Sequence, residues 1–238
     1  MDGWYWNRKH PLSYVPIASA ESVLRRWITP SIFQAQNGAV VDEWTLCAMV
    51  PDAAQILQKH WATWASLADF QRIASVGFNT VRIPVGYWAF MHVDGEPYIQ
   101  GAADYLDQAI GWARQTGLKV WIDLHGAPGS QNGYDNSGHR IPKPGWESGN
   151  TVQQTLEVIQ IMAKKYATPE MQDVVVAIEM LNEPLTSALQ STEALVEFYK
   201  SGYNNVRSVG NTPVVMQDGF QPNHFWDSIL APGDAKSG

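Results

Sequence analysis

The chain has 238 residues, a formal net charge of −7 and an isoelectric point near 5.3, and this acidic balance argues against nucleic acid or an anionic membrane surface as its partner. Its length is that of one domain with a sizeable core, and no stretch is long and apolar enough to span a bilayer. Cys47 is the single cysteine, which excludes an intrachain disulfide and a cysteine-based zinc site.

The N-terminal segment carries no readable secretory leader. Residues 1–11 are polar and aromatic, and only a short run interrupted by proline precedes Ala18-Ser19-Ala20, which has the small residues of a cleavage site. We therefore predict no signal peptide from this segment.

From about Trp61 onward, a helix followed by a strand occurs four times. Amphipathic helical segments, three of them closed by a glycine, each precede a short apolar run. Four such units imply right-handed crossovers and a parallel sheet, of either a barrel or an open fold. The expected helices cover residues 67–76, 104–116, 152–166 and 192–209, and the expected strands cover residues 79–85, 119–124, 174–181 and 213–217.

Two long loops rich in Gly, Pro and Asn interrupt this pattern. They cover residues 86–103 and 125–150, and each of them follows an expected strand. Loops in this position lie on the face where α/β folds bind ligands, so we expect the functional residues there.

Polar side chains occur where the expected strands end. Arg82 lies within the first strand, Asp123 and His125 end the second, and Gln217-Asp218 end the fourth. A buried Arg82 needs a carboxylate or a ligand beside it, and a structural ion pair explains it as well as a functional role does. A lone His125 is more often a satisfied core group than a catalyst, and with Asp123 it lacks a third metal ligand nearby in sequence. We therefore predict no metal site.

Asn182-Glu183-Pro184 ends the third expected strand, whose near-continuous apolar sequence indicates burial on both faces. Glu183 would then lie at the carboxyl end of the sheet, where α/β barrels carry their chemistry. Pro184 is expected to end the strand and to favour an extended backbone at Glu183. Asn182 supplies an amide suited to a sugar hydroxyl, although an exposed carboxylate at a strand end is the simpler interpretation of the triplet alone.

Together these motifs resemble glycoside hydrolase family 5, and more closely its fungal exo-β-1,3-glucanase branch. The similarity covers roughly residues 27–230 and includes the whole of residues 121–133, whose run 125–133 is a far stronger match than the Asn-Glu-Pro triplet alone. The other matching segments are Trp27-Ile28-Thr29-Pro30-Ser31-Ile32-Phe33, Phe78-Asn79-Thr80-Val81-Arg82-Ile83-Pro84, Gly86-Tyr87-Trp88-Ala89-Phe90, Asp135-Asn136-Ser137-Gly138 and Leu181-Asn182-Glu183-Pro184.

The resemblance implies a (β/α)₈ TIM barrel and retaining hydrolysis of β-1,3-glucan, or a related β-glucoside, from the non-reducing end with release of glucose. Glu183 matches the general acid/base, Tyr134 an aromatic that stacks on the incoming sugar, and Asp135 a position that touches substrate. No cofactor is implied, and a monomer located outside the cell or in the cell wall is expected. The residues matching those around the sugar at the cleavage point are Arg82, His125 and Asn182.

The sequence also departs from the family pattern. Residues 1–26 look unrelated, and Arg25 stands where the family has a sugar-binding Glu, so we divide the chain into a divergent segment (1–26) and a partial catalytic domain (27–238). The expected barrel is incomplete, with about strands 2–5, an altered first strand and no strands 6–8. Retaining hydrolysis needs two carboxylates, and the family's nucleophile follows a later strand. The alternative expectation is therefore an inactive truncated fragment or a non-catalytic glucan-binding protein.

Overall fold

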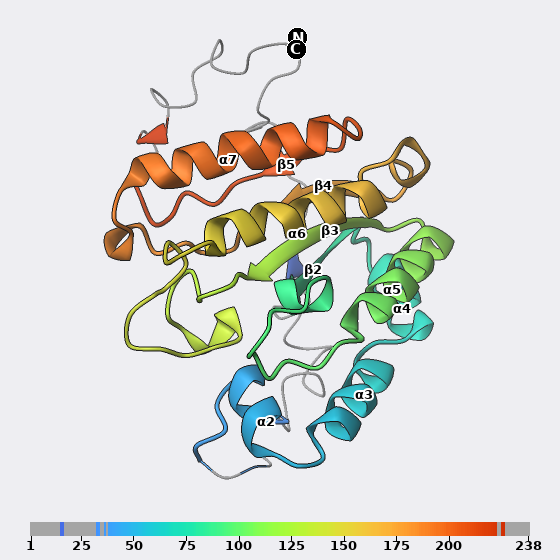
Figure 1. Cartoon of the computed structure of the whole chain (residues 1–238). Helices are drawn as coiled ribbons and strands as arrows, with labels where there is room; N and C mark the ends of the chain where they lie inside the picture. The colour runs from blue at the N-terminus through green and yellow to red at the C-terminus, as the bar shows by residue number, and fades with distance from the viewer. Residues whose placement is uncertain (1–14, 17–31, 34–35, 37, 223–224, 227–238) are drawn as a thin grey trace.

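The computed structural model describes residues 15–16, 32–33, 36, 38–222 and 225–226. In this part of the chain, five parallel strands form one sheet in the order β1-β2-β3-β4-β5 (Figure 1). The strands are β1 (Val15–Pro16), β2 (Thr80–Gly86), β3 (Lys119–Gly126), β4 (Val175–Glu179) and β5 (Val214–Val215). The helices are α2 (Glu43–Met49), α3 (Ala53–Trp64), α4 (Leu67–Ser75), α5 (Ala102–Thr116), α6 (Thr151–Tyr166) and α7 (Thr192–Arg207). Short 3₁₀ helices are η1 (Tyr87–Ala89), η2 (Asp135–Ser137), η3 (Pro169–Met171) and η4 (Thr186–Ala188).

The strand order decides between the two predicted sheet types. Each strand pairs with the next one along the chain, and every pairing is parallel. A doubly wound open sheet reverses its order at a switch point, whereas a barrel adds each strand on the same side of the last. The sheet is therefore an arc of a (β/α)₈ barrel, and α6 and α7 lie side by side over it (Figure 1).

The four predicted helix and strand units are confirmed, with differences at their ends. α5 ends where Gly117 takes a left-handed conformation with φ of 74°, as the glycine stop indicated. β4 ends at Glu179, two residues before the predicted end of its strand, and β5 is shorter than predicted as well. Beyond the assigned end of β4, Met180 N still donates to Val215 O at 3.0 Å and Asn182 N donates to Leu124 O at 2.9 Å, so backbone contacts with both neighbouring strands continue into the loop.

Three elements were not expected from the sequence. α2 and α3 precede the repeating pattern, and a capping box in which Asp42 and Thr45 bind each other's backbone N–H groups starts α2. β1 is too short to show a pattern of its own, and it pairs with β2 at Val81 and Arg82. The altered first strand and Arg25 belong to residues 17–31, which lie outside the described residues.

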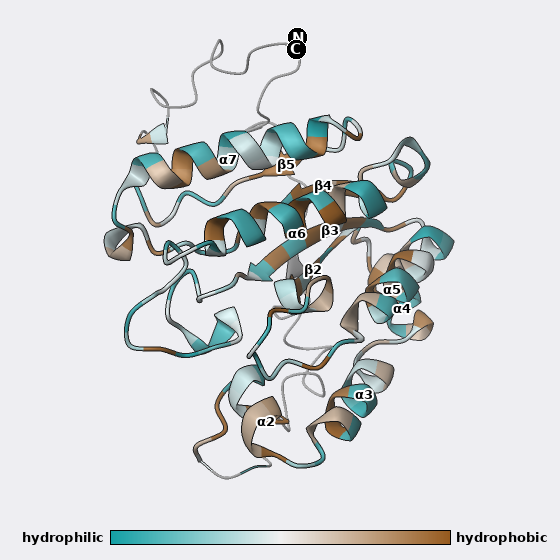
Figure 2. Ribbon diagram, viewed as in Figure 1, coloured by the Kyte–Doolittle hydropathy of each residue, from teal (hydrophilic) through white to brown (hydrophobic). Residues whose placement is uncertain are grey.

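The core lies between the sheet and its helices. Ile122 of β3 and Ile178 of β4 are fully buried, and so are Ile159 and Met162 of α6 and Leu195 of α7. Figure 2 shows hydrophobic strands beneath helices whose outward surfaces are largely hydrophilic. Burying one such side chain stabilises a fold by about 1.5–3 kcal/mol, so this layer positions the strand ends firmly. Among the described residues, no helix combines the length and hydropathy that crossing a bilayer requires.

A half-buried glutamate links α2 to η1, which follows β2. Glu43 Oε1 accepts a hydrogen bond of 2.8 Å from the indole Nε1 of Trp88. Trp88 in turn stacks on Tyr98, with ring centroids 4.2 Å apart. Burial raises the pKa of Glu43 from its ordinary 4.5 to about 7, although the Trp88 hydrogen bond opposes the shift.

This raised pKa predicts that the fold loses stability as the pH rises from 4.5 to about 7. In that range the folded state keeps a proton on Glu43 that the unfolded state has released. We expect the free energy of unfolding to be roughly 2–3 kcal/mol smaller at about pH 8 than at about pH 5 through this group. Urea unfolding at both pH values would measure it. Glu43→Gln should remove this part of the slope, and an unchanged slope would contradict the prediction.

Candidate active site

An arginine joins three neighbouring strands at the carboxyl edge of the sheet. Arg82 of β2 donates from Nε to Glu179 Oε2 at 2.7 Å and from Nη2 to Glu179 Oε1 at 2.8 Å. Its Nη2 also lies 2.9 Å from Asp123 Oδ2. Asp123 and Glu179 are register partners on β3 and β4, with side chains 0% and 1% exposed. The ion pair that the sequence left open for Arg82 is present, and its partner Glu179 was not singled out beforehand.

Burial of these carboxylates has an electrostatic cost that Arg82 offsets. Burial is the main effect that raises the pKa of Glu179, the charge of Asp123 adds to it, and the hydrogen bonds of Arg82 oppose it. The same guanidinium donates from Nη2 to Asn182 Oδ1 at 2.8 Å. Arg82 therefore sets one positive charge between the two carboxylates and orients the amide next to Glu183.

His125 extends this network toward solvent. Its Nδ1 lies 2.6 Å from Asp123 Oδ2, and its side chain is 27% exposed. A carboxylate at this distance accepts the Nδ1 proton, so in the neutral imidazole Nε2 carries the lone pair. His125 is thus paired on one side and accessible on the other.

The backbone at Glu183 corrects the sequence prediction. Its φ is 46°, in the left-handed region, rather than extended as Pro184 suggested. Both flanks of the turn are held by hydrogen bonds: Asn182 N donates to Leu124 O at 2.9 Å, and Leu185 N donates to Gln131 O at 3.1 Å. These contacts determine the turn, and such conformations cost about 1–3 kcal/mol that the surrounding structure must supply.

Gln131 supplies much of this restraint, and sequence reasoning gave it no role. Its side chain is fully buried, and its Nε2 donates to the carbonyl oxygens of His125 at 2.8 Å and Asn182 at 2.9 Å. Its Oε1 accepts from Ala127 N at 3.0 Å. One side chain thus ties the end of β3 to the end of β4. An amide within a Gly, Pro and Ser loop was the only signal in the sequence.

The Glu183 carboxylate is partly exposed and is held from the loop after β3. Its Oε2 accepts a hydrogen bond of 2.9 Å from Nδ2 of Asn136, which belongs to η2. Asn132 Nδ2 donates to Asn136 Oδ1 at 3.2 Å, so the amide is oriented in turn. Beside it, Nδ2 of Asn182 is buried and has no hydrogen-bond partner among the described residues. A buried donor of this kind favours an oxygen of a ligand.

The two remaining predicted residues lie on the same loop as Asn136. Tyr134 is 48% exposed, and its backbone N donates to Asn132 Oδ1 at 2.9 Å. Asp135 is exposed at the start of η2. The structure therefore places an aromatic ring and a carboxylate next to the group that holds Glu183, while their roles toward substrate stay predictions.

Comparisons with known proteins agree with this geometry. The model of the family "Cellulase (glycosyl hydrolase family 5)" matches residues 50–232. A glucan 1,3-beta-glucosidase of Schwanniomyces occidentalis is 49% identical over 217 residues, which cover 87% of this chain and 51% of that protein. A probable glucan 1,3-beta-glucosidase A of Aspergillus niger is 47% identical over 211 residues, covering 87% and 50%. The chain spans about half the length of the curated relatives it matches.

A solved structure shares the fold. The rutinosidase from Aspergillus niger superposes with a TM-score of 0.75 at 23% sequence identity, over 83% of this chain and 60% of that one. Similarity at this level speaks for the fold only, and it agrees with the barrel arc described above. With the family model matching most of its residues, the chain belongs to glycosyl hydrolase family 5.

Proposed function

We propose that this chain carries the general acid/base of a retaining active site that hydrolyses β-1,3-glucan from its non-reducing end and releases glucose. The observation that carries the proposal is that Glu183, whose carboxylate Asn136 holds at 2.9 Å, directly follows Asn182, whose buried Nδ2 has no hydrogen-bond partner among the described residues. A carboxyl group that reaches solvent can exchange a proton with a glycosidic oxygen. The neighbouring amide can bind a sugar hydroxyl.

The mechanism divides the reaction into two steps. Glu183 protonates the leaving oxygen as a glycosyl-enzyme forms, and it then takes a proton from the water that hydrolyses this intermediate. The second carboxylate must lie about 5–5.5 Å from the first. Asp123 and Glu179 are almost fully buried and bound to Arg82, so neither of them is placed for attack on a sugar. The reaction therefore needs a carboxylate other than these two.

The choice of substrate rests on the relatives and on the surface near Glu183. The two relatives aligned above by sequence are named glucan 1,3-beta-glucosidase and probable glucan 1,3-beta-glucosidase A, which supports β-1,3-glucan or a related β-glucoside as the substrate. Tyr134 offers an exposed ring for stacking on a sugar face, and Asp135 offers an acceptor for its hydroxyls. The family resemblance also favours a location outside the cell or in the cell wall.

A chimera tests this function. The part of the Schwanniomyces occidentalis relative that follows the matched region would be joined to this chain, and glucose release from laminaritriose would be measured. We expect release by the chimera, whereas a chimera that folds and binds laminaritriose without cleaving it would overturn the proposal. Calorimetry and the same assay on the chain alone would show whether it binds glucan without hydrolysing it, which is the non-catalytic alternative.

A further inference from the structure

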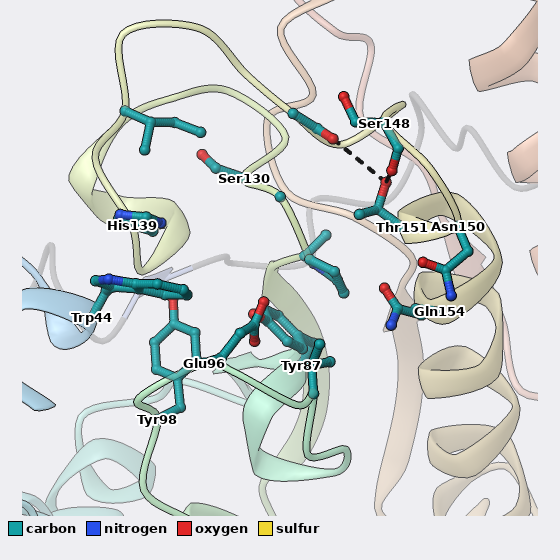
Figure 3. A pocket seen from close by; sticks show the side chains of 16 residues that line it. Trp44, Tyr87, Glu96, Tyr98, Ser130, His139, Ser148, Asn150, Thr151 and Gln154 are labelled. Carbon is teal, nitrogen blue, oxygen red and sulfur yellow. Dashed lines mark hydrogen bonds between the residues drawn. The ribbon is translucent and has the colours of Figure 1, made fainter. Parts of the chain in front are cut away.

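A pocket of about 430 Å³ lies between the loop after β3, the residues that follow β2 and the start of α6 (Figure 3). None of Arg82, His125, Asn182 or Glu183 lines it. We call it the loop pocket, because the loop between β3 and α6 forms one of its walls. The side chains used in the argument below are Trp44, Glu96, Tyr98, His139, Asn150 and Gln154.

The loop wall of this pocket is held in place by contacts within the loop. Gly145 N donates to Gly129 O at 2.7 Å, and the Oγ atoms of Ser130 and Ser137 lie 2.6 Å apart. Gly129 has a φ of 77°, and a Cβ there would meet Gly145 O at 2.6 Å, so only glycine fits. The loop pocket is therefore formed before any ligand arrives, which lowers the entropy cost of binding.

One side of the pocket is aromatic. Trp44 stacks on His139, with centroids 4.0 Å apart and an interplanar angle of 0°. It meets Tyr98 edge to face at 5.4 Å. Figure 3 shows these three rings on the side of the pocket away from Asn150 and Gln154. His139 covers one face of Trp44 and Trp88 covers one face of Tyr98, so these rings form a rigid aromatic wall of the pocket by packing on one another.

The opposite side presents neutral amides. Asn150 immediately precedes α6, yet its side chain makes no capping hydrogen bond to the helix. Gln154 lies one turn further along, and Figure 3 shows both side chains together at the pocket. In the part of the chain that the structure describes, neither side-chain amide has a hydrogen-bond partner. Two free amides at a preformed pocket offer both donors and acceptors to a ligand.

The lining defines the chemical class of the ligand. No lysine or arginine lines the pocket, so a phosphate or a carboxylate would find no countercharge. Glu96 provides one carboxylate, which accepts a hydrogen bond from the Tyr87 hydroxyl, and the other polar side chains are uncharged amides and hydroxyls together with the His139 imidazole. The volume lies within the range of small-molecule sites, roughly 300–1,000 Å³. A rigid wall opposite neutral amides and hydroxyls, with no cationic side chain, matches an uncharged ligand that carries many hydroxyl groups, such as a saccharide.

We propose that the loop pocket is a second saccharide site, which binds a short segment of β-glucan separately from Glu183. The saccharide class follows from the lining, and the choice of β-glucan rests on the proposed function. Because the same loop carries Asn136 toward Glu183 and Ser130 toward the pocket, the two sites lie on one structural unit.

Laminaritriose titrated into the ¹⁵N-labelled full chain tests this proposal by NMR. We expect saturable shifts of the side-chain amide signals of Asn150 and Gln154. The double variant Asn150→Ala/Gln154→Ala should weaken binding at the pocket by about tenfold or more, measured on the remaining pocket signals, because it removes two hydrogen-bonding partners. Gln153→Ala is the matched control, since Gln153 is exposed on the same helix, binds Glu157 and does not line the pocket, and it should leave the affinity unchanged.

The amide signals of Asn136 and Asn182 report on the other site in the same titration. Shifts at Asn150 and Gln154 without shifts at Asn136 and Asn182 would support the pocket and count against the proposed function. Shifts confined to Asn136 and Asn182 would overturn the pocket proposal and leave the proposed function standing. Pocket shifts that persist with equal affinity in the double variant would also overturn it.

Discussion

Replacing Glu183 by glutamine in the chimera is expected to lower the hydrolysis of laminaritriose roughly 10²–10⁴-fold, the usual contribution of a general acid/base. Glutamine keeps the size of the side chain and can still interact with Asn136, but it has no proton to give to the leaving oxygen. Steady-state kinetics of glucose release would measure the loss. We expect it mainly in kcat, because Glu183 acts on the reacting bond rather than on binding.

The role of Glu183 can be separated from that of a nucleophile by the leaving group. Dinitrophenolate leaves a dinitrophenyl β-glucoside without needing a proton. Formation of the glycosyl-enzyme from this substrate should therefore be spared in Glu183→Gln, and a burst of dinitrophenol should appear. Azide should speed the breakdown of the glycosyl-enzyme, because it is a nucleophile that, unlike water, needs no general base. Glu193→Gln, an exposed carboxylate at the start of α7, is the matched control and should change neither reaction. Equal loss on both substrates would contradict the acid/base assignment.

Replacing Arg82 by methionine is expected to destabilise the fold by about 3–5 kcal/mol, the usual cost of removing one partner from a buried ion pair. The change leaves Glu179 and Asp123 buried without the guanidinium that lies 2.7–2.9 Å from them. Urea unfolding at neutral pH would measure the loss. The loss should become smaller as the pH is lowered, because burial already raises the pKa of Glu179 and so favours its protonated form.

Two further variants show whether burial is the cause. Arg114 makes a comparable pair with Asp173, its Nε lying 2.7 Å from Oδ2, but these side chains are 43% and 54% exposed. Arg114→Met should therefore cost only about 0–1 kcal/mol. Arg82→Met/Glu179→Gln should recover part of the stability lost in Arg82→Met, since it removes one of the two carboxylates that lose their partner. Equal costs for the two arginines would contradict the explanation.

Much of the fold was predictable because local patterns encode it. Apolar residues with a period of 3.6, followed by a left-handed glycine such as Gly117, specify a helix and its end within a few residues. β1 and the helices α2 and α3 lay outside the prediction. A two-residue strand and a seven-residue helix carry little periodic signal, whereas α3 is amphipathic but lies ahead of the repeating units from which the helices were predicted. The choice between barrel and open sheet also needed the strand order, which no single element contains.

The candidate site was predictable to a smaller extent. The positions of Arg82, His125, Asn182 and Glu183 at strand ends followed from the sequence and from the family resemblance. Their partners did not, because Arg82 and Glu179 are separated by 97 positions and meet only through the register of three strands. Glu179, a lone acid in an apolar run, requires a partner when it is buried, but the sequence does not say which residue that partner is.

The sequence by itself thus determined the parallel α/β architecture, the family and the position of the acid, since these depend on local periodicity and on short motifs. Tertiary structure alone decided how that acid is presented. The left-handed backbone at Glu183, against the preference of a residue before proline, exists because Gln131 and Leu124 hold the neighbouring backbone groups. Hydrogen bonds between distant segments outweigh a local preference of a few kcal/mol when several of them act on one turn.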